Sequence, residues 1–183
     1  MDKVADKEEL LQLLTPSGEQ TGVFEYRSVV HQKGLYHQEI GVIPVNNKGE
    51  VLLQRRSKNK KSYPNCWGLC AGHVVEKQST TEAAVMEVNE ELGLSINEND
   101  LKILVNKTKN ERNDNKCFAT CFYVLTDKLL DFFKKQDEEV EELKWFSIDE
   151  FEDLIISENN CIFKNNKYYR LIIKNLKQIV DTF

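Results

Sequence analysis

The segment STTEAAVMEVNEELGL, residues 79–94, constrains the fold more than any other part of the sequence. Ser79 is a good N-cap residue, and Glu82, three residues later, completes a capping box. Gly93 stands where helices commonly end with a residue in the left-handed conformation. The sequence therefore predicts a helix over residues 80–92. Its apolar positions are expected to form one buried face: Ala83, Ala84, Val88 and Leu92.

Strand-like and helix-like segments alternate around this helix. Alternating and β-rich runs predict strands at residues 38–45, 50–55, 101–108, 116–126 and 142–147. Further helices are expected at residues 7–14, at residues 147–156 after a second capping box, and at residues 167–181. The turn sequence Asn46–Gly49 indicates that the first two strands form a hairpin. This mixture favours an α/β domain, or α+β in some schemes.

Composition excludes several classes of function. A length of 183 residues fits one domain. The 25 basic and 30 acidic residues give a net charge of −5, which argues against nucleic-acid coating and against attachment to an anionic membrane. No apolar run approaches the roughly 18 residues of a membrane span, and no secretion signal is recognised. The odd number of cysteines, five, then favours reduced thiols and a cytoplasmic location.

Three glutamates on the predicted helix break the rules of helix design in the same place. Glu87, Glu90 and Glu91 have i, i+3 and i+4 spacing, so their carboxylates share one face. They also lie near the C-terminal end, where the helix dipole disfavours negative charge. A bound cation removes this conflict, and oxygen ligands suit Mg²⁺ or Mn²⁺. The spacing alone leaves a solvated acidic face as the alternative.

The segment 72–94 resembles the Nudix box of the MutT-like pyrophosphatases. Seven residues match the box in register: Gly72, Glu87, Val88, Glu90, Glu91, Gly93 and Leu94. Two positions depart from it, because Gln78 replaces the first box glutamate and Met86 replaces the box arginine. The two changes remove one charge of each sign and are therefore interpreted as one compensated change. Since the family's arginine helps to hold the glutamate beside it, the orientation of Glu87 is placed in doubt.

The resemblance implies one Nudix domain over residues 1–183, an α/β/α sandwich with a mixed β-sheet between helices. Residues 1–30 form an N-terminal extension in this interpretation, and residues 167–183 include a C-terminal helix. The implied activity is Mg²⁺-dependent hydrolysis of a phosphoanhydride bond in a nucleoside diphosphate linked to another moiety, with Mn²⁺ as a possible substitute. The implied metal ligands are Glu87, Glu90, Glu91 and the backbone carbonyl near Gly72. Glu87 and Glu90 are the expected catalytic residues, with Glu87 as ligand or base.

The base can lie outside the box in this family, so the acidic run at residues 137–142 supplies a candidate in Glu139, with a solvated loop as the alternative.

Upstream, residues 27–37, the stretch LLQRRSKNKKSYPNCW and the tripeptide GHV resemble the branch that contains isopentenyl diphosphate isomerase. The residues expected to bind substrate are Arg55, Arg56, His37, His73 and Glu139. A solvated basic loop is the alternative for the arginines, and hydrogen bonding of the loop before the first strand is the alternative for His31 and His37.

Two other functions remain open at this stage. The isomerase needs a cysteine immediately before its Gly-His pair, but Ala71 stands there, and Cys70 should point to the opposite face of a strand. This difference favours a hydrolase. The replacements at Gln78 and Met86 motivate the other alternative, a non-catalytic nucleotide-binding module. The expected partners are a small nucleotide-type diphosphate, with no nucleic acid and no membrane, in a monomer or a homodimer.

Overall fold

The computed structural model describes residues 8–60, 62–112, 115–157, 162–163 and 165–181. The strands are β1 Leu10–Leu14, β2 Gln20–Tyr26, β3 Tyr36–Val45, β4 Val51–Arg56, β5 Trp67–Gly68, β6 Cys70–His73, β7 Lys102–Arg112, β8 Asn115–Leu125 and β9 Val140–Phe146. The helices are α1 Arg27–Lys33, α2 Thr80–Leu92, α3 Ile148–Ile156 and α4 Lys167–Val180, with short 3-10 turns at Glu98–Asp100 and Leu130–Phe132.

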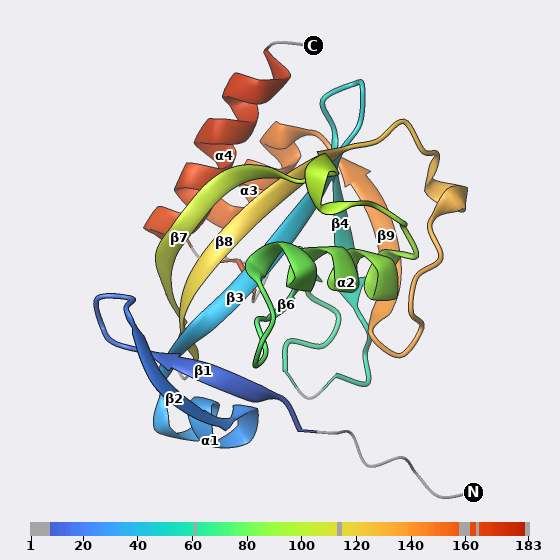
Figure 1. Cartoon of the computed structure of the whole chain (residues 1–183). Coiled ribbons are helices and arrows are strands. Elements are labelled where there is room, and N and C mark those ends of the chain that lie inside the picture. Colours follow the sequence, from blue (N-terminus) through green and yellow to red (C-terminus); the bar gives the residue numbers. More distant parts are fainter. Residues whose placement is uncertain (1–7, 61, 113–114, 158–161, 164, 182–183) are drawn as a thin grey trace, which may run out of the picture.

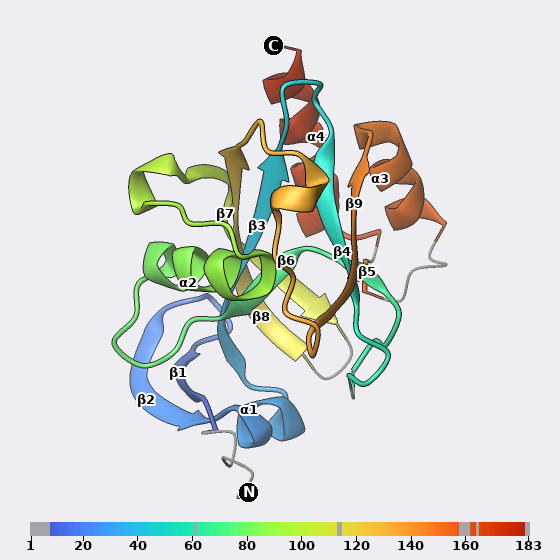
Figure 2. The ribbon, with the colours of Figure 1, turned by 90° about the vertical axis from the view of Figure 1, so that its right-hand side faces the viewer.

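The sheet is organised around the long strand β3. Strands β1, β4 and β6 pair with β3 in the antiparallel direction, whereas β8 runs parallel to it over residues 36–45 and 116–125. Helix α2 lies on one side of the sheet, and α3 and α4 lie on the other (Figures 1 and 2). Two apolar cores correspond to these two sides. The expectation of an α/β/α sandwich around a mixed sheet is confirmed.

Helix α2 has the predicted bounds because its ends are fixed by local hydrogen bonds. The Ser79 side chain accepts from the Glu82 N–H, and the Glu82 side chain accepts from the Ser79 N–H. Gly93 adopts the left-handed conformation (φ 63°), in which its N–H bonds the Asn89 carbonyl. The four apolar positions expected on one face are all buried: Ala83, Ala84, Val88 and Leu92.

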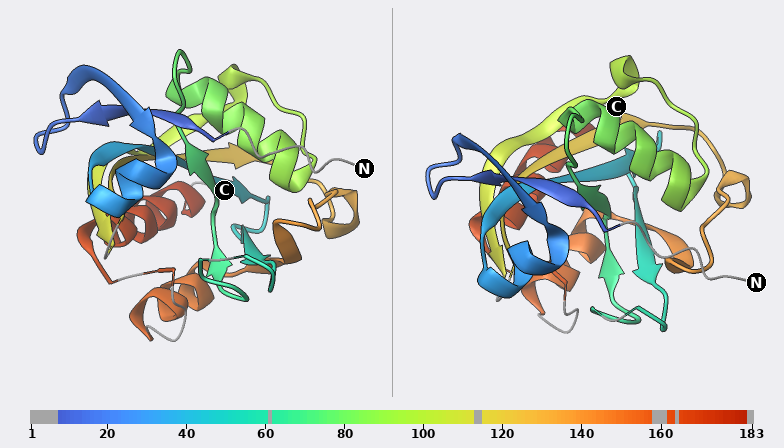
Figure 3. Two further views of the ribbon diagram at one scale, coloured as in Figure 1. Left: turned by 90° about the horizontal axis from the view of Figure 1, so that it is seen from below. Right: turned by 60° about the horizontal axis from the view of Figure 1, so that its bottom comes forward.

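The N-terminal region differs from its prediction. Residues 7–14 were expected to be helical, but Leu10–Leu14 form β1, which pairs with β2 and touches β3. The helix-forming residues of this stretch yield to tertiary pairing, because an extended chain buries Leu11 and Leu14 beneath the sheet. Strand β2 and helix α1 were not anticipated. Seen from below, β1, β2 and α1 lie together at one end of the sheet (Figure 3).

The C-terminal helix packs on its own sheet. The Asn175 side-chain amide donates to the Leu104 carbonyl of β7 at 2.6 Å, and α4 buries Ile172 and Leu176. None of the described helices is both long and apolar enough to cross a membrane.

The cysteines only partly follow their prediction. Cys70, Cys117 and Cys121 are buried free thiols. Cys66 is disulfide-bonded, so the expectation of five reduced thiols is wrong for it. The reason is that pairing depends on how close the fold brings two sulfur atoms, which an odd count does not reveal. Cys161 lies outside the described residues.

Candidate functional site

Strand β6 separates the site into two halves. It pairs with β3 so that Gly72 lies opposite Ile40, and His73 lies opposite Glu39. Because side chains alternate across a strand, Cys70 and Gly72 face α2, whereas Ala71 and His73 face the other side. The expectation that a cysteine at position 70 points away from the face used by position 71 is therefore confirmed.

On the α2 side, two of the three predicted glutamates converge on β6. A Cβ atom built on Gly72 would overlap the Glu87 carboxylate, so only glycine permits this approach. Glu91 is buried, with 6% of its surface exposed. Glu90 is exposed to solvent. The box register thus brings Glu87, Glu91 and Gly72 together and leaves Glu90 at the rim, close enough for its charge to act on Glu87.

Burial and mutual repulsion perturb these carboxylates. Desolvation, followed by the charges of Glu91 and Glu90, raises the pKa of Glu87 to about 8. Desolvation also raises the pKa of Glu91 to about 7, although hydrogen bonds from Gln54, Cys70 and Ala71 oppose the rise. A buried acid beside a half-buried one, both with raised pKa values, is a common feature of functional sites.

Glu91 is held by groups that the sequence did not reveal. The Gln54 side-chain amide of β4 donates to Glu91 Oε2 at 2.8 Å and to the Leu69 carbonyl at 3.1 Å. The Ala71 N–H also donates to Glu91 Oε2, at 3.3 Å. A polar residue at an inward position of the apolar strand LLQRR was the available signal.

The two departures from the box contact each other. The Gln78 side-chain amide lies 3.6 Å from the Met86 sulfur, and the Gln78 side-chain oxygen accepts from the Val75 N–H at 3.3 Å. Two neutral side chains, Gln78 and Met86, thus contact each other at the positions where the box has a glutamate and an arginine. This geometry agrees with the interpretation of a single compensated change.

On the other side of β6 lies a cleft of about 200 Å³. Its lining includes Arg27, Arg56, Arg112, Tyr63 and Tyr168. Arg112 pairs with Glu39 at 2.7 Å. Burial disfavours both charges, but the pairing outweighs it, so the pKa of Glu39 is lowered and the pKa of Arg112 is raised. Arginine side chains around a small cleft favour an anionic ligand.

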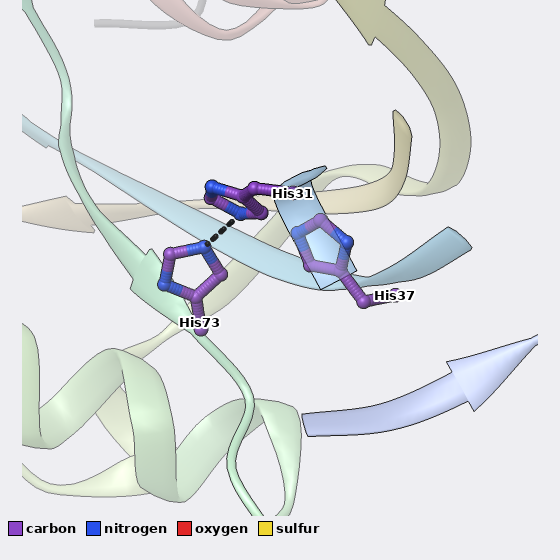
Figure 4. Close-up of side chains that lie close together, drawn as sticks. All are labelled: His31, His37 and His73. Atoms are coloured by element: carbon purple, nitrogen blue, oxygen red, sulfur yellow. Dashed lines mark hydrogen bonds between the residues drawn. The ribbon is translucent and has the colours of Figure 1, made fainter. Parts of the chain in front are cut away.

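Three histidines converge beside this cleft (Figure 4). One ring nitrogen from each of His31, His37 and His73 lies within 4.8 Å of the other two. His73 Nε2 is 3.3 Å from His31 Nε2. Glu39 Oε1 lies 3.6 Å from His37 Nε2 and 3.7 Å from His73 Nε2. Desolvation and the neighbouring His73 lower the pKa of His31 to about 4. His37 hydrogen-bonds the preceding loop through the Leu35 carbonyl at 3.2 Å.

The acidic run and the basic loop bind each other. Lys60 pairs with Glu139, and Arg55 pairs with Glu142 at 2.8 Å. Arg56 differs from Arg55, because it lines the cleft and donates to the Ser62 carbonyl. The segment just before the run is attached to the end of α2 by backbone bonds, including Gln136 N–H to the Glu91 carbonyl at 3.3 Å.

The residues on the α2 side fit a hard divalent cation. Their donor atoms are carboxylate oxygens, and the Glu87 carboxylate lies against a glycine whose missing side chain makes room for it. Burial raises the pKa of both acids, and the charge of Glu91 adds to the rise at Glu87, so a cation beside them would favour their ionised forms. The histidine cluster offers a second set of donors, of the nitrogen type that suits transition metals.

Comparison with known proteins places the chain in a family. The NUDIX domain model matches residues 35–164. An uncharacterized Nudix hydrolase of Listeria monocytogenes is 33% identical over 78% of this chain and 82% of its own length. Nudix hydrolase 3 of Arabidopsis thaliana is 34% identical over 83% of this chain, which corresponds to only 21% of that protein.

A relative from the isomerase branch and a solved structure also support the assignment to this family. An isopentenyl-diphosphate Delta-isomerase of Saccharopolyspora erythraea is 32% identical over 46% of this chain and 44% of its own length. Among solved structures, DR0079 of Deinococcus radiodurans gives a TM-score of 0.69 at 16% identity, covering 91% of this chain and 98% of that one. The chain therefore belongs to the Nudix family, and it resembles the branch that includes the isomerases. Nudix enzymes generally use a divalent metal and hydrolyse pyrophosphate bonds.

Proposed function

We propose that this chain is a Mg²⁺-dependent hydrolase, able to use Mn²⁺, that cleaves a phosphoanhydride bond in a nucleoside diphosphate linked to another moiety. The observation that carries the proposal is the convergence of Glu87 and Glu91 on Gly72, with Glu90 at the rim. The family match supports the reaction class. The small arginine-lined cleft supports an anionic substrate.

The residues have distinct proposed roles. Glu87, Glu90, Glu91 and the Gly72 carbonyl hold the cation, which when bound neutralises phosphate charge and lowers the pKa of a coordinated water. Glu87 is either a ligand or the proton acceptor, and its raised pKa matches a base that works near neutral pH. Glu139 is the alternative base. The charge of Glu139 raises the pKa of both Glu87 and Glu91, which supports this alternative.

On the far side of β6, Arg56 is the proposed contact for the substrate's phosphates. It lines the cleft, and within the described residues no carboxylate pairs with it. His73 also lines the cleft, whereas His37 lies behind it in the histidine cluster. Arg55 is a weaker candidate because Glu142 already neutralises it.

The test is phosphate and monophosphate release from a panel of diphosphates, with Mg²⁺ and then with EDTA. The panel contains nucleoside di- and triphosphates, nucleotide sugars, ADP-ribose, NADH and coenzyme A. Glu87→Gln and Glu90→Gln are expected to lower turnover about 10²- to 10⁴-fold. Glu141→Gln, at an exposed position of β9, is the matched control and should keep full activity. Metal-independent cleavage, or full activity in both variants, would refute the proposal.

One observation favours a second candidate, an isopentenyl diphosphate isomerase. The histidine cluster beside the cleft provides nitrogen ligands, and isomerases are among the relatives. Against it, Ala71 faces the cleft where the isomerase needs a cysteine acid. Incubation of isopentenyl diphosphate with the enzyme and Mg²⁺ distinguishes the two, because an allylic product would establish isomerisation.

A further inference from the structure

Gln54 is a polar residue in an apolar environment. It lies on β4 with 3% of its surface exposed, between Gly68 of β5 and Leu143 of β9. Its neighbour on the same face, Leu52, belongs to the apolar core under α2. A buried amide in such a place lowers stability unless hydrogen bonds compensate it, so its contacts indicate what it does there.

The contacts fix the orientation of the amide. Both neighbours of the side-chain nitrogen are oxygen atoms that can only accept, namely Glu91 Oε2 and the Leu69 carbonyl. The nitrogen must therefore face them, and both of its hydrogens are used. The side-chain oxygen of Gln54 is buried with no hydrogen-bond partner among the described residues. In the orientation that binds Glu91, the amide oxygen of Gln54 therefore has no hydrogen-bond partner among the described residues.

These bonds join two elements that carry proposed metal ligands. Glu91 comes from α2, and Leu69 immediately precedes β6, which carries Gly72. The Ala71 N–H reinforces the link by donating to the same carboxylate oxygen. Both N–H donors are directed at Oε2, and the Cys70 thiol is a further hydrogen-bond partner of the Glu91 carboxylate.

We propose that Gln54 is a positioning residue, which holds Glu91 and the start of β6 in the arrangement that binds the divalent cation. This inference depends on the proposed function. Groups that orient metal ligands through hydrogen bonds typically change metal affinity or activity about 10- to 100-fold when they are removed. Gln54 is expected to act in this range while having little effect on substrate affinity, because it does not itself line the cleft.

The experiment measures Mn²⁺ binding by isothermal titration calorimetry on the purified full chain. The main variant, Gln54→Met, keeps the length and volume of the side chain but donates no hydrogen bond. Gln54→Asn keeps the amide but is too short to reach both oxygens, and it serves if the first variant is poorly folded. Thr120→Val is the matched control, because Thr120 is also buried on a strand and its hydroxyl accepts from the Lys107 N–H, away from Glu91.

Both Gln54 variants should bind Mn²⁺ about 10- to 100-fold more weakly than the parent protein. With a cleavable substrate, kcat at fixed Mn²⁺ should fall, KM should stay within about twofold, and excess Mn²⁺ should restore kcat. Thr120→Val should bind Mn²⁺ normally. If folded Gln54 variants bind Mn²⁺ with unchanged affinity while Glu91→Gln still weakens binding, the inference about Gln54 is wrong and the proposed metal site stands. If the parent protein binds no Mn²⁺, or Glu91→Gln binds it normally, both the inference and the proposed metal site fail.

Discussion

The ionisation of Glu87 should make the metal-free protein less stable as the pH rises. Its pKa is raised from 4.5 to about 8 in the fold, so the folded chain holds this proton more tightly than the unfolded chain. The resulting stabilisation is fully present below pH 4.5 and is lost as the pH rises through 8. Replacement by glutamine, which cannot ionise, should therefore stabilise the metal-free protein at alkaline pH and change little in acid.

The size of the effect follows from the shift. Each pKa unit corresponds to about 1.4 kcal/mol, so the full shift sets an upper limit of about 5 kcal/mol at alkaline pH. If only about 2 kcal/mol of this is realised, a chain of this length should gain about 4–8 °C in Tm. The measurement is differential scanning calorimetry of Glu87→Gln and the parent protein in EDTA, at pH 4 and pH 8.5.

Addition of Mg²⁺ should reverse the order of stability. A ligand that binds only the folded state raises Tm, and the variant has lost one of the proposed ligands. At pH 8.5 with saturating Mg²⁺, the parent protein should gain more in Tm than Glu87→Gln. Glu141→Gln is again the control and should show the same small difference at both pH values. A Glu87→Gln effect that is equal at pH 4 and pH 8.5, or a loss of stability at pH 8.5, would refute the reasoning.

Three further predictions concern other parts of the site. Gly72→Ala should displace the Glu87 carboxylate and weaken Mn²⁺ binding in calorimetry, and unaltered affinity would contradict the proposed close approach. Glu39→Gln should leave Arg112 without its partner and lower the free energy of unfolding by about 3–5 kcal/mol in urea titrations; a change below about 1 kcal/mol would show that the pair is unimportant. Arg56→Ala should raise KM with little change in kcat, whereas an unchanged KM would remove it from the substrate site.

Local patterns in the sequence predicted those elements whose limits are set by local interactions. Helix α2 was predicted to the residue because its capping box and its terminal glycine act within a few positions. The prediction of a helix at residues 7–14 was wrong because long-range strand pairing, and not the local sequence, determines the structure there. Their composition favours a helix, but Leu11 is fully buried only when the chain joins β2 and β3 as a strand. Strand β2 escaped notice because most of its side chains are exposed and show no alternation.

The same distinction applies to the site. The box spacing predicted that Glu87 and Glu91 share a helix face, and the structure places both against β6. Spacing could not predict the contact of Gln54 with Glu91, since the two residues are 37 positions apart. Nor could it predict the Arg112–Glu39 pair, whose partners are 73 positions apart and meet only because β7 and β3 both pair with β8. Both contacts depend on how the strands pair in the sheet, which the local spacing of residues does not reveal.

The alternation of side chains along β6 explains why the hydrolase and isomerase alternatives can be separated by one residue. The Glu87 and Glu91 carboxylates lie on the α2 face of β6 with Cys70, whereas Ala71 faces the arginine-lined cleft, which Gly72 also lines. Cys70 cannot replace the missing acid, because its buried thiol is directed at Glu91 and its pKa is raised well above the ordinary value by burial and by Glu91. An alanine at position 71 therefore removes a proton donor from one face and leaves the carboxylates on the other face intact. This difference favours the proposed hydrolase over the isomerase.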